Sequence, residues 1–130
     1  MTGTTGISRV LVDSSGWLEF LTADTKAAQF EAYLVNPNNE LIVPTIVLYE
    51  VRKKLLVGQM KTAEDWFVSE ALRHTVVPLD ETIAIDAAAT SHRFRVALAD
   101  AIIYTTAVAE NAQLVTGDAH FASLPKVTIV

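Results

Sequence analysis

Four carboxylates in this 130-residue chain stand beside or within apolar segments, and their side chains could do chemistry. They are Asp13, Glu50, Asp100 and Asp118. A buried charge without a partner is costly, so each of these positions needs a compensating group. Carboxylates that converge on one site repel one another and favour a bound cation. Ligands made only of oxygen suit Mg²⁺ or Mn²⁺ better than zinc.

Asp13 directly follows the β-branched run Arg9–Val12, which predicts a short strand. In open α/β sheets, ligands bind at the carboxyl ends of the strands, so this position suits a ligand. The alternative is a helix N-cap, in which the carboxylate accepts helix amides. We expect Ser14 or Ser15 to cap the next helix, which would leave Asp13 pointing into the crevice.

Asp118 has a similar position, two residues beyond the end of the predicted strand Gln113–Thr116. The ordinary interpretation is a turn residue in a Gly-Asp pair, and for an isolated pair it would be preferred. The parallel with Asp13 favours a second carboxylate at the same edge of the sheet. His74, His92 and His120 are scattered along the chain, and we interpret them as ordinary polar histidines.

Asp100 lies in the first turn of a predicted helix, Leu98–Asn111, that is apolar almost all round. The helix dipole stabilises a carboxylate there by about 0.3–1 kcal/mol, which is small against the cost of burying an unpaired charge. A ligand role is therefore favoured over a helix-start role. Glu50 lies in mid-helix, where a surface pair with Lys54 is the simpler interpretation. It becomes a candidate only through its association with the three aspartates.

Alternating strands and helices must position these residues. We expect strands at 9–12, 41–43, 75–79, 113–116 and 127–129, and helices at 14–21, 26–34, 44–57, 62–73, 80–93 and 98–111. Such alternation predicts an α/β fold: a three-layer α/β/α sandwich around a central, mainly parallel sheet of four or five strands. Pro78 places its strand at an edge or a strand end. Gly58 and Asp80 indicate helix boundaries, and Thr62 with Asp65 resembles a capping box.

Composition indicates one globular domain over residues 1–130, with residues 1–7 as a flexible N-terminal extension. Hydrophobic residues make up 51% of the chain and charged residues 19%, with no cysteine. No apolar run is long enough to span a membrane, and no signal peptide is visible, so we expect a cytoplasmic protein. The net charge of −5 argues against nonspecific binding to polyanions. Two basic clusters partly offset it, and they are candidate nucleic-acid contacts: Arg52, Lys53 and Lys54, and Arg93 with Arg95.

The ordered motifs resemble the PIN-domain family and, within it, the VapC-type toxins of bacterial and archaeal toxin–antitoxin pairs. The matching pieces are Val12–Ser15, Glu50, Leu98–Ile103 and Leu114–Phe121. Each motif is weak alone, but the ordered set fits a domain of this length from end to end.

This resemblance implies a hydrolase, a magnesium-dependent endoribonuclease in which Mn²⁺ can replace Mg²⁺. Asp13 and Asp100 would be the principal metal ligands, and Asp118 would complete the acidic pocket directly or through water. Glu50 would bind metal or orient the attacking water. By the same resemblance, Ser14 and Thr116 would support the pocket through their hydroxyl groups.

The resemblance also implies partners: an RNA substrate, a second copy in a homodimer, and a small VapB-type antitoxin that blocks the acidic site within a larger complex. A second hypothesis is a noncatalytic PIN-like module that binds a protein partner, suggested by the −5 charge and the hydrophobic composition. A receiver-like signalling domain is disfavoured. It requires an Asp closing a mid-chain strand and a Lys at a late strand end, and Pro44 and Thr116 occupy those places.

Overall fold

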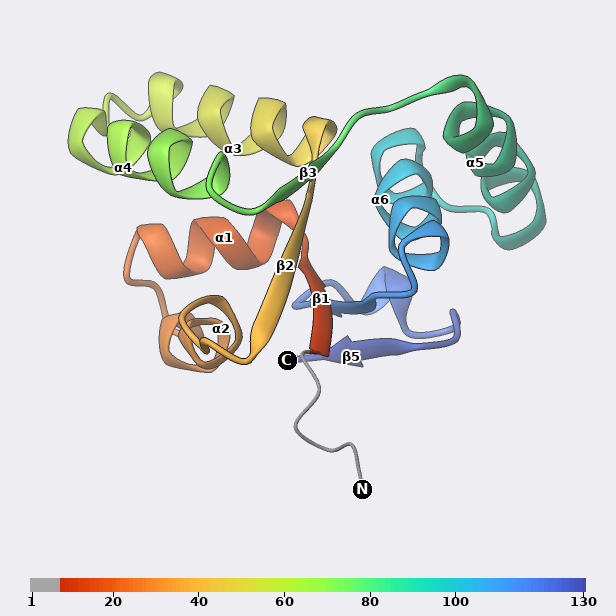
Figure 1. Ribbon diagram of the computed structural model, residues 1–130, viewed down its shortest axis with the longest axis horizontal. Helices are drawn as coiled ribbons and strands as arrows, with labels where there is room; N and C mark the ends of the chain where they lie inside the picture. Colours follow the sequence, from red (N-terminus) through yellow and green to blue (C-terminus); the bar gives the residue numbers. More distant parts are fainter. Residues whose placement is uncertain (1–7) are drawn as a thin grey trace.

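The computed structural model describes residues 8–130 (Figure 1), so the predicted extension at residues 1–7 lies outside the described residues. The strands are β1 (Ser8–Val12), β2 (Asn39–Pro44), β3 (Thr75–Val77), β4 (Gln113–Thr116) and β5 (Val127–Ile129). The helices are α1 (Ser14–Leu21), α2 (Ala27–Leu34), α3 (Thr45–Val57), α4 (Lys61–Ala71), α5 (Glu81–Phe94) and α6 (Leu98–Ala109). A 3₁₀ turn, η1 (Ala119–Phe121), was not predicted. Among these residues, no helix is long and apolar enough to cross a bilayer.

The five strands form one sheet in the order β3-β2-β1-β4-β5, and every pairing is parallel. The first strand of the chain is therefore central, with Val10 opposite Leu41 of β2 and Val12 opposite Val115 of β4. This confirms the predicted α/β fold with a parallel sheet. β3 lies at an edge, as expected, because Pro78 follows it immediately and has no N–H to continue the ladder.

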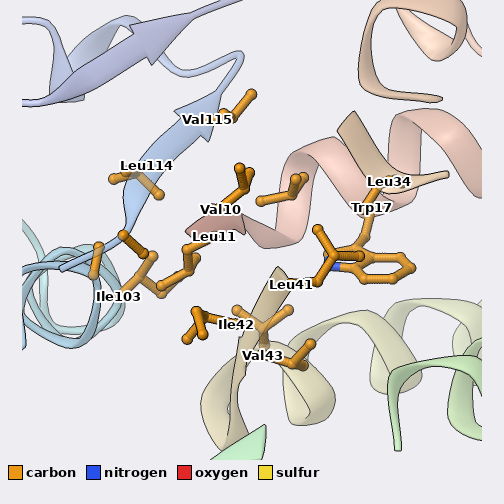
Figure 2. Close-up of a cluster of buried hydrophobic side chains, with 14 of the residues drawn as sticks. Val10, Leu11, Trp17, Leu34, Leu41, Ile42, Val43, Ile103, Leu114 and Val115 are labelled. Carbon is orange, nitrogen blue, oxygen red and sulfur yellow. The ribbon is translucent and has the colours of Figure 1, made fainter. Parts of the chain in front are cut away.

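Helices cover both faces of the sheet, which gives the predicted three layers. In Figure 1, α1 to α4 lie to the left of β1 and β2, and α5 and α6 lie to the right. The strands are apolar on both faces, as parallel strands between helices must be. Figure 2 shows the core between these layers, where Leu11, Ile42 and Leu114 of neighbouring strands pack together. Trp17 of α1 is fully buried, and its ring meets Phe67 of α4 edge-on at 5.1 Å.

Two of the predicted helix boundaries are confirmed, and one is wrong. Asp80 caps α5 by accepting a hydrogen bond from the Ile83 amide, as predicted. Gly58 ends α3, although the left-handed residue there is Gln59, at φ 56°. The capping box at Thr62 is wrong: α4 begins one residue earlier, at Lys61, after Met60, and no side chain caps it.

Candidate functional site

Asp13, Glu50, Asp100 and Asp118 line one pocket at the carboxyl ends of β1 and β4. They come from four separate segments: the β1–α1 junction, the middle of α3, the first turn of α6 and the loop after β4. The parallel sheet brings the ends of β1 and β4 together because the two strands are neighbours. The packed helices α3 and α6 add the other two carboxylates from above the sheet edge.

Hydrogen-bond donors from α1 and from β4 hold the Asp13 carboxylate. Its Oδ1 accepts a hydrogen bond from the Gly16 amide at 2.9 Å, and its Oδ2 accepts one from the Thr116 hydroxyl. Ser15 Oγ donates to both oxygens, at 2.9 and 3.0 Å. The expectation that Ser14 or Ser15 caps α1 and leaves Asp13 free is wrong, because Asp13 is itself the N-cap. It caps the helix and lines the pocket at once, since each carboxylate oxygen can accept more than one hydrogen bond.

Burial makes the Asp13 carboxylate harder to ionise. The residue is only 4% exposed, and burial raises the pKa of Asp13 above its ordinary value of 3.8. The hydrogen bonds from Thr116, Gly16 and Ser15 oppose this effect and lower the pKa, whereas the charge of Asp118 raises it further. The hydrogen bonds therefore favour the charged form of Asp13, but among residues 8–130 this carboxylate forms no ion pair with a basic side chain.

The pKa of Asp100 is raised as well, and fewer hydrogen-bond donors oppose this effect than at Asp13. It is half-buried, and burial is the largest cause that raises the pKa of Asp100. The charges of Asp118, Glu50 and Asp13 raise this pKa further, and His120 lowers it slightly. The charges of the other three pocket carboxylates thus all act on Asp100. Its α6 neighbours Ala101 to Ala107 are buried, in agreement with the apolar sequence.

Glu50 contacts α1, not its own helix. The Ser14 hydroxyl donates a hydrogen bond of 2.6 Å to Glu50 Oε1, which joins the start of α1 to the middle of α3. The alternative of a surface pair between Glu50 and Lys54 is not formed among residues 8–130. Ser14 thus contacts one of the pocket carboxylates, and its predicted supporting role stays a prediction.

Asp118 is fixed by the turn that follows β4. Its amide donates to Thr116 Oγ1 at 2.9 Å, and its Oδ1 accepts from the His120 amide at 2.9 Å. The His120 Nδ1 atom lies 3.0 Å from the same oxygen. The sequence interpretation of His120 as an incidental histidine missed this contact. Its only signal was the spacing of two residues from Asp118, which a 3₁₀ turn brings together.

The predicted basic contacts divide into two groups. Lys53 and Lys54 line the acidic pocket, beside the exposed Tyr49 that sequence analysis did not single out. Arg52 points elsewhere, with its Nε 3.1 Å from the buried carboxylate of Glu64 on α4. Arg93 and Arg95, at the end of α5, do not line the pocket: Arg93 lies over the Phe94 ring at 5.0 Å, and Arg95 ends the helix at φ 57°.

The donor set fits a hard divalent cation. Every acidic group at the pocket offers oxygen, and burial followed by the charges of neighbouring carboxylates raises the pKa of Asp13 and of Asp100, so a cation would stabilise their ionised forms. Within residues 8–130, no three Asp, Glu or His side chains are grouped closely enough to hold one ion directly. Mg²⁺ is usually bound by one or two carboxylates and keeps several waters, so this spacing is compatible with it.

Comparisons with known proteins agree with this fold. The fold is similar to that of a toxin–antitoxin complex from Klebsiella pneumoniae, with TM-score 0.72, 26% identity, and coverage of 92% of this chain and 95% of that one. It is also similar to VapBC2 from Rickettsia felis bound to a DNA fragment from its promoter, with TM-score 0.72, 18% identity, and coverage of 94% and 97%. Curated protein sequences gave no match. The PIN domain family model matches residues 10–127, so the chain belongs to the PIN-domain family.

Proposed function

We propose that this protein is a VapC-type toxin, a Mg²⁺-dependent endoribonuclease held inactive by a VapB-type antitoxin. The observation that supports it best is the single pocket lined by Asp13, Glu50, Asp100 and Asp118 at the carboxyl edge of the sheet. PIN domains are generally nucleases, and the two similar structures described above are toxin–antitoxin complexes.

The side chains divide the chemistry between them. Asp13 and Asp100 would hold Mg²⁺, or Mn²⁺ in its place, and Asp118 would complete the pocket directly or through water. Such an ion lowers the pKa of a bound water and stabilises a leaving oxygen in phosphodiester hydrolysis. Glu50, oriented by Ser14, would position the attacking water and accept its proton. Thr116 would keep the Asp13 carboxylate in place through its buried hydroxyl.

Other surfaces support the proposed partners. An apolar pocket lined by Phe20, Leu21, Met60 and Trp66 lies between α1 and α4 and could bind an antitoxin segment. Ile85 of α5 and Leu98 of α6 are 70% and 76% exposed, which favours a homodimer interface on that side. A toxin that cleaves cellular RNA would act in the cytoplasm.

The direct test replaces one carboxylate without changing its shape. Asp100→Asn should abolish magnesium-dependent cleavage of total cellular RNA by the purified protein and should relieve growth inhibition in cells that express it. Asp86→Asn, an exposed aspartate on α5 outside the pocket, is the matched control and should keep both activities. Undiminished cleavage by Asp100→Asn would show that the carboxylate pocket is not the active site.

The alternative, a noncatalytic binding module, predicts a different outcome. Under that hypothesis the protein would co-purify with a small partner but cleave no RNA with Mg²⁺ or Mn²⁺. Co-expression with the protein encoded by the neighbouring reading frame tests the antitoxin, and the mass of the purified complex in solution tests the homodimer.

A further inference from the structure

One wall of the acidic pocket is lined by aromatic and basic side chains and not by carboxylates alone. Tyr49, Lys53 and Lys54 line it from α3, next to Glu50. Tyr49, Lys53 and Val57 are four residues apart and so lie on one face of the helix. Val47, Val51 and Leu55 on the opposite face are buried in the core. We call Tyr49, Lys53 and Lys54 the α3 lip.

The residues of the α3 lip are accessible and are not used by the fold. The Tyr49 side chain is 62% exposed, which is unusual for a large ring beside a pocket. Neither lysine forms an ion pair with any carboxylate in residues 8–130, whereas the adjacent Arg52 is paired with Glu64. The Lys53 ammonium lies 5.7 Å from the centre of the Tyr49 ring. An aromatic face and two lysines are thus available to a ligand in the pocket.

The charge of the pocket determines which ligand these residues suit. A phosphodiester that enters the pocket meets four carboxylates, in a protein of net charge −5. A bound cation would offset this repulsion only at the reacting phosphate. The next phosphates along the strand need other positive charges, and Lys53 and Lys54 are the basic side chains that line the pocket. A Tyr ring provides a stacking platform for a base, which is the usual way proteins bind unpaired nucleotides.

We propose that the α3 lip binds single-stranded RNA next to the scissile phosphate, with one unpaired base stacked on Tyr49 and the neighbouring phosphates on Lys53 and Lys54. The inference rests on the ribonuclease function proposed above and assigns the residues that would hold the RNA beside the acidic site. Stacking of a base on a tyrosine is stronger than an exposed contact between an ammonium and a ring. RNA would therefore move the Lys53 ammonium from the ring to a phosphate. A paired base could not stack on Tyr49, so the lip would select loops and single strands over duplexes.

The test measures RNA binding separately from cleavage. In the full-length Asp100→Asn protein, which should not cleave, a short single-stranded RNA that contains one fluorescent adenine analogue reports stacking through quenching of its fluorescence. Tyr49→Ala should weaken binding about tenfold and abolish the quenching, since loss of one stacking contact has effects of about this size. Tyr49→Phe keeps the ring and should retain both. The same RNA annealed to its complement should bind more weakly and show no dependence on Tyr49.

The lysines require a control of equal charge. Lys53→Gln and Lys54→Gln should each weaken binding and reduce its dependence on salt concentration, because each removes one phosphate contact. Lys126→Gln changes the same charge away from the pocket and should leave binding unchanged. Circular dichroism of each variant checks that it is folded.

Several outcomes would overturn the inference. If Tyr49→Ala leaves the RNA affinity and the fluorescence quenching unchanged, the α3 lip does not bind unpaired bases. The same conclusion follows if duplex RNA binds as tightly as single-stranded RNA. If the variants lose only co-purification with an antitoxin, the lip is a protein contact. In these cases, cleavage by the protein with Asp100 intact would leave the proposed ribonuclease function standing. If that protein neither binds nor cleaves RNA, both proposals fail.

Discussion

The hydroxyl of Ser14 donates a 2.6 Å hydrogen bond to Glu50, so the start of α1 fixes a carboxylate in the middle of α3. The two residues are 36 positions apart in the chain. This contact holds the Glu50 carboxylate at the pocket. Without it, Glu50 could instead pair with Lys54, one turn further along the same helix.

Ser14→Ala should reduce RNA cleavage about tenfold while leaving the protein folded, because a hydrogen bond to a charged group contributes about 1.5–3 kcal/mol. Initial rates of cleavage and a thermal unfolding curve measure the two effects. Ser91→Ala removes another partly buried hydrogen bond of a hydroxyl, to the carbonyl of Val96, and neither residue lines the acidic pocket. The Ser91→Ala variant should be less stable but should cleave RNA at the unchanged rate. If Ser14→Ala cleaves RNA as fast as Ser91→Ala, Ser14 does not contribute to cleavage.

Thr116→Val should lower the free energy of unfolding by about 1–3 kcal/mol, because the Asp118 amide loses its acceptor and Asp13 loses a donor. The Thr116 hydroxyl lowers the pKa of Asp13, so its removal should move the acid limb of the pH–rate profile to higher pH. Thr106→Val is the matched control: that hydroxyl is also buried, but it bonds only to the Ile102 carbonyl within α6. An unshifted profile in Thr116→Val would contradict the coupling to Asp13.

Asp100→Asn should raise the melting temperature at pH 7 when divalent ions are absent. The pKa of Asp100 is raised in the folded protein, which therefore binds this proton more tightly than the unfolded chain. The free energy of unfolding should then fall as the pH rises from near 3.8 through the raised pKa. The advantage of the variant should accordingly vanish at pH values below 3.8. Asp86→Asn should show no such dependence, and a variant that is less stable at pH 7 would refute the proposed repulsion.

Mg²⁺ or Mn²⁺ should stabilise the protein at neutral pH, since a cation relieves the repulsion among the carboxylates. A ligand at about 100 times its dissociation constant adds about 2.7 kcal/mol to the free energy of unfolding. Thermal unfolding is measured with increasing MgCl₂ or MnCl₂, against NaCl of equal ionic strength and against EDTA. Asp100→Asn should lose most of the shift. A shift of the same size in the variant would place the cation elsewhere.

Gly16→Ala should destabilise the protein by about 1–3 kcal/mol through overpacking. A Cβ atom at this position would lie 2.5 Å from Val12 Cγ1 and 2.6 Å from Phe30 Cε1. The Gly16 amide also donates a hydrogen bond to Asp13, so a backbone shift that relieves the overpacking should lower cleavage as well. Gly58→Ala provides the comparison, because its nearest atom is 3.4 Å away and its φ is −78°. Chemical denaturation should show little change in the free energy of unfolding for Gly58→Ala. If Gly16→Ala changes it equally little, the close contacts at Gly16 do not cause overpacking.

Much of the fold could be predicted from the sequence because the signals are local. Runs of β-branched residues predict the strands, and the alternation with helices predicts a parallel sheet. The Thr62 capping box failed because the short segment between Gly58 and Lys61 is shaped by the left-handed Gln59. A local motif could not reveal that turn.

The site was predictable in its members but not in its contacts. Asp13 was expected to be either a cap or a ligand, and its extended backbone, at φ −71° and ψ 174°, lets one oxygen cap α1 while the other meets Thr116. Arg52 was grouped with Lys53 and Lys54 by proximity in sequence, but the buried Glu64 binds it on another face. Such outcomes depend on tertiary neighbours, which helical spacing does not specify.

The strand order also determines when the pocket can exist during synthesis. β1 emerges from the ribosome first, yet its neighbour β4 and the Thr116 hydroxyl that holds Asp13 lie 103 residues later. Asp118 follows later still. A nascent chain therefore carries Asp13, Glu50 and Asp100 without the strand that completes their site. Nuclease activity of the kind proposed would therefore require that β4 and the loop after it have been synthesised and that β4 has paired with β1.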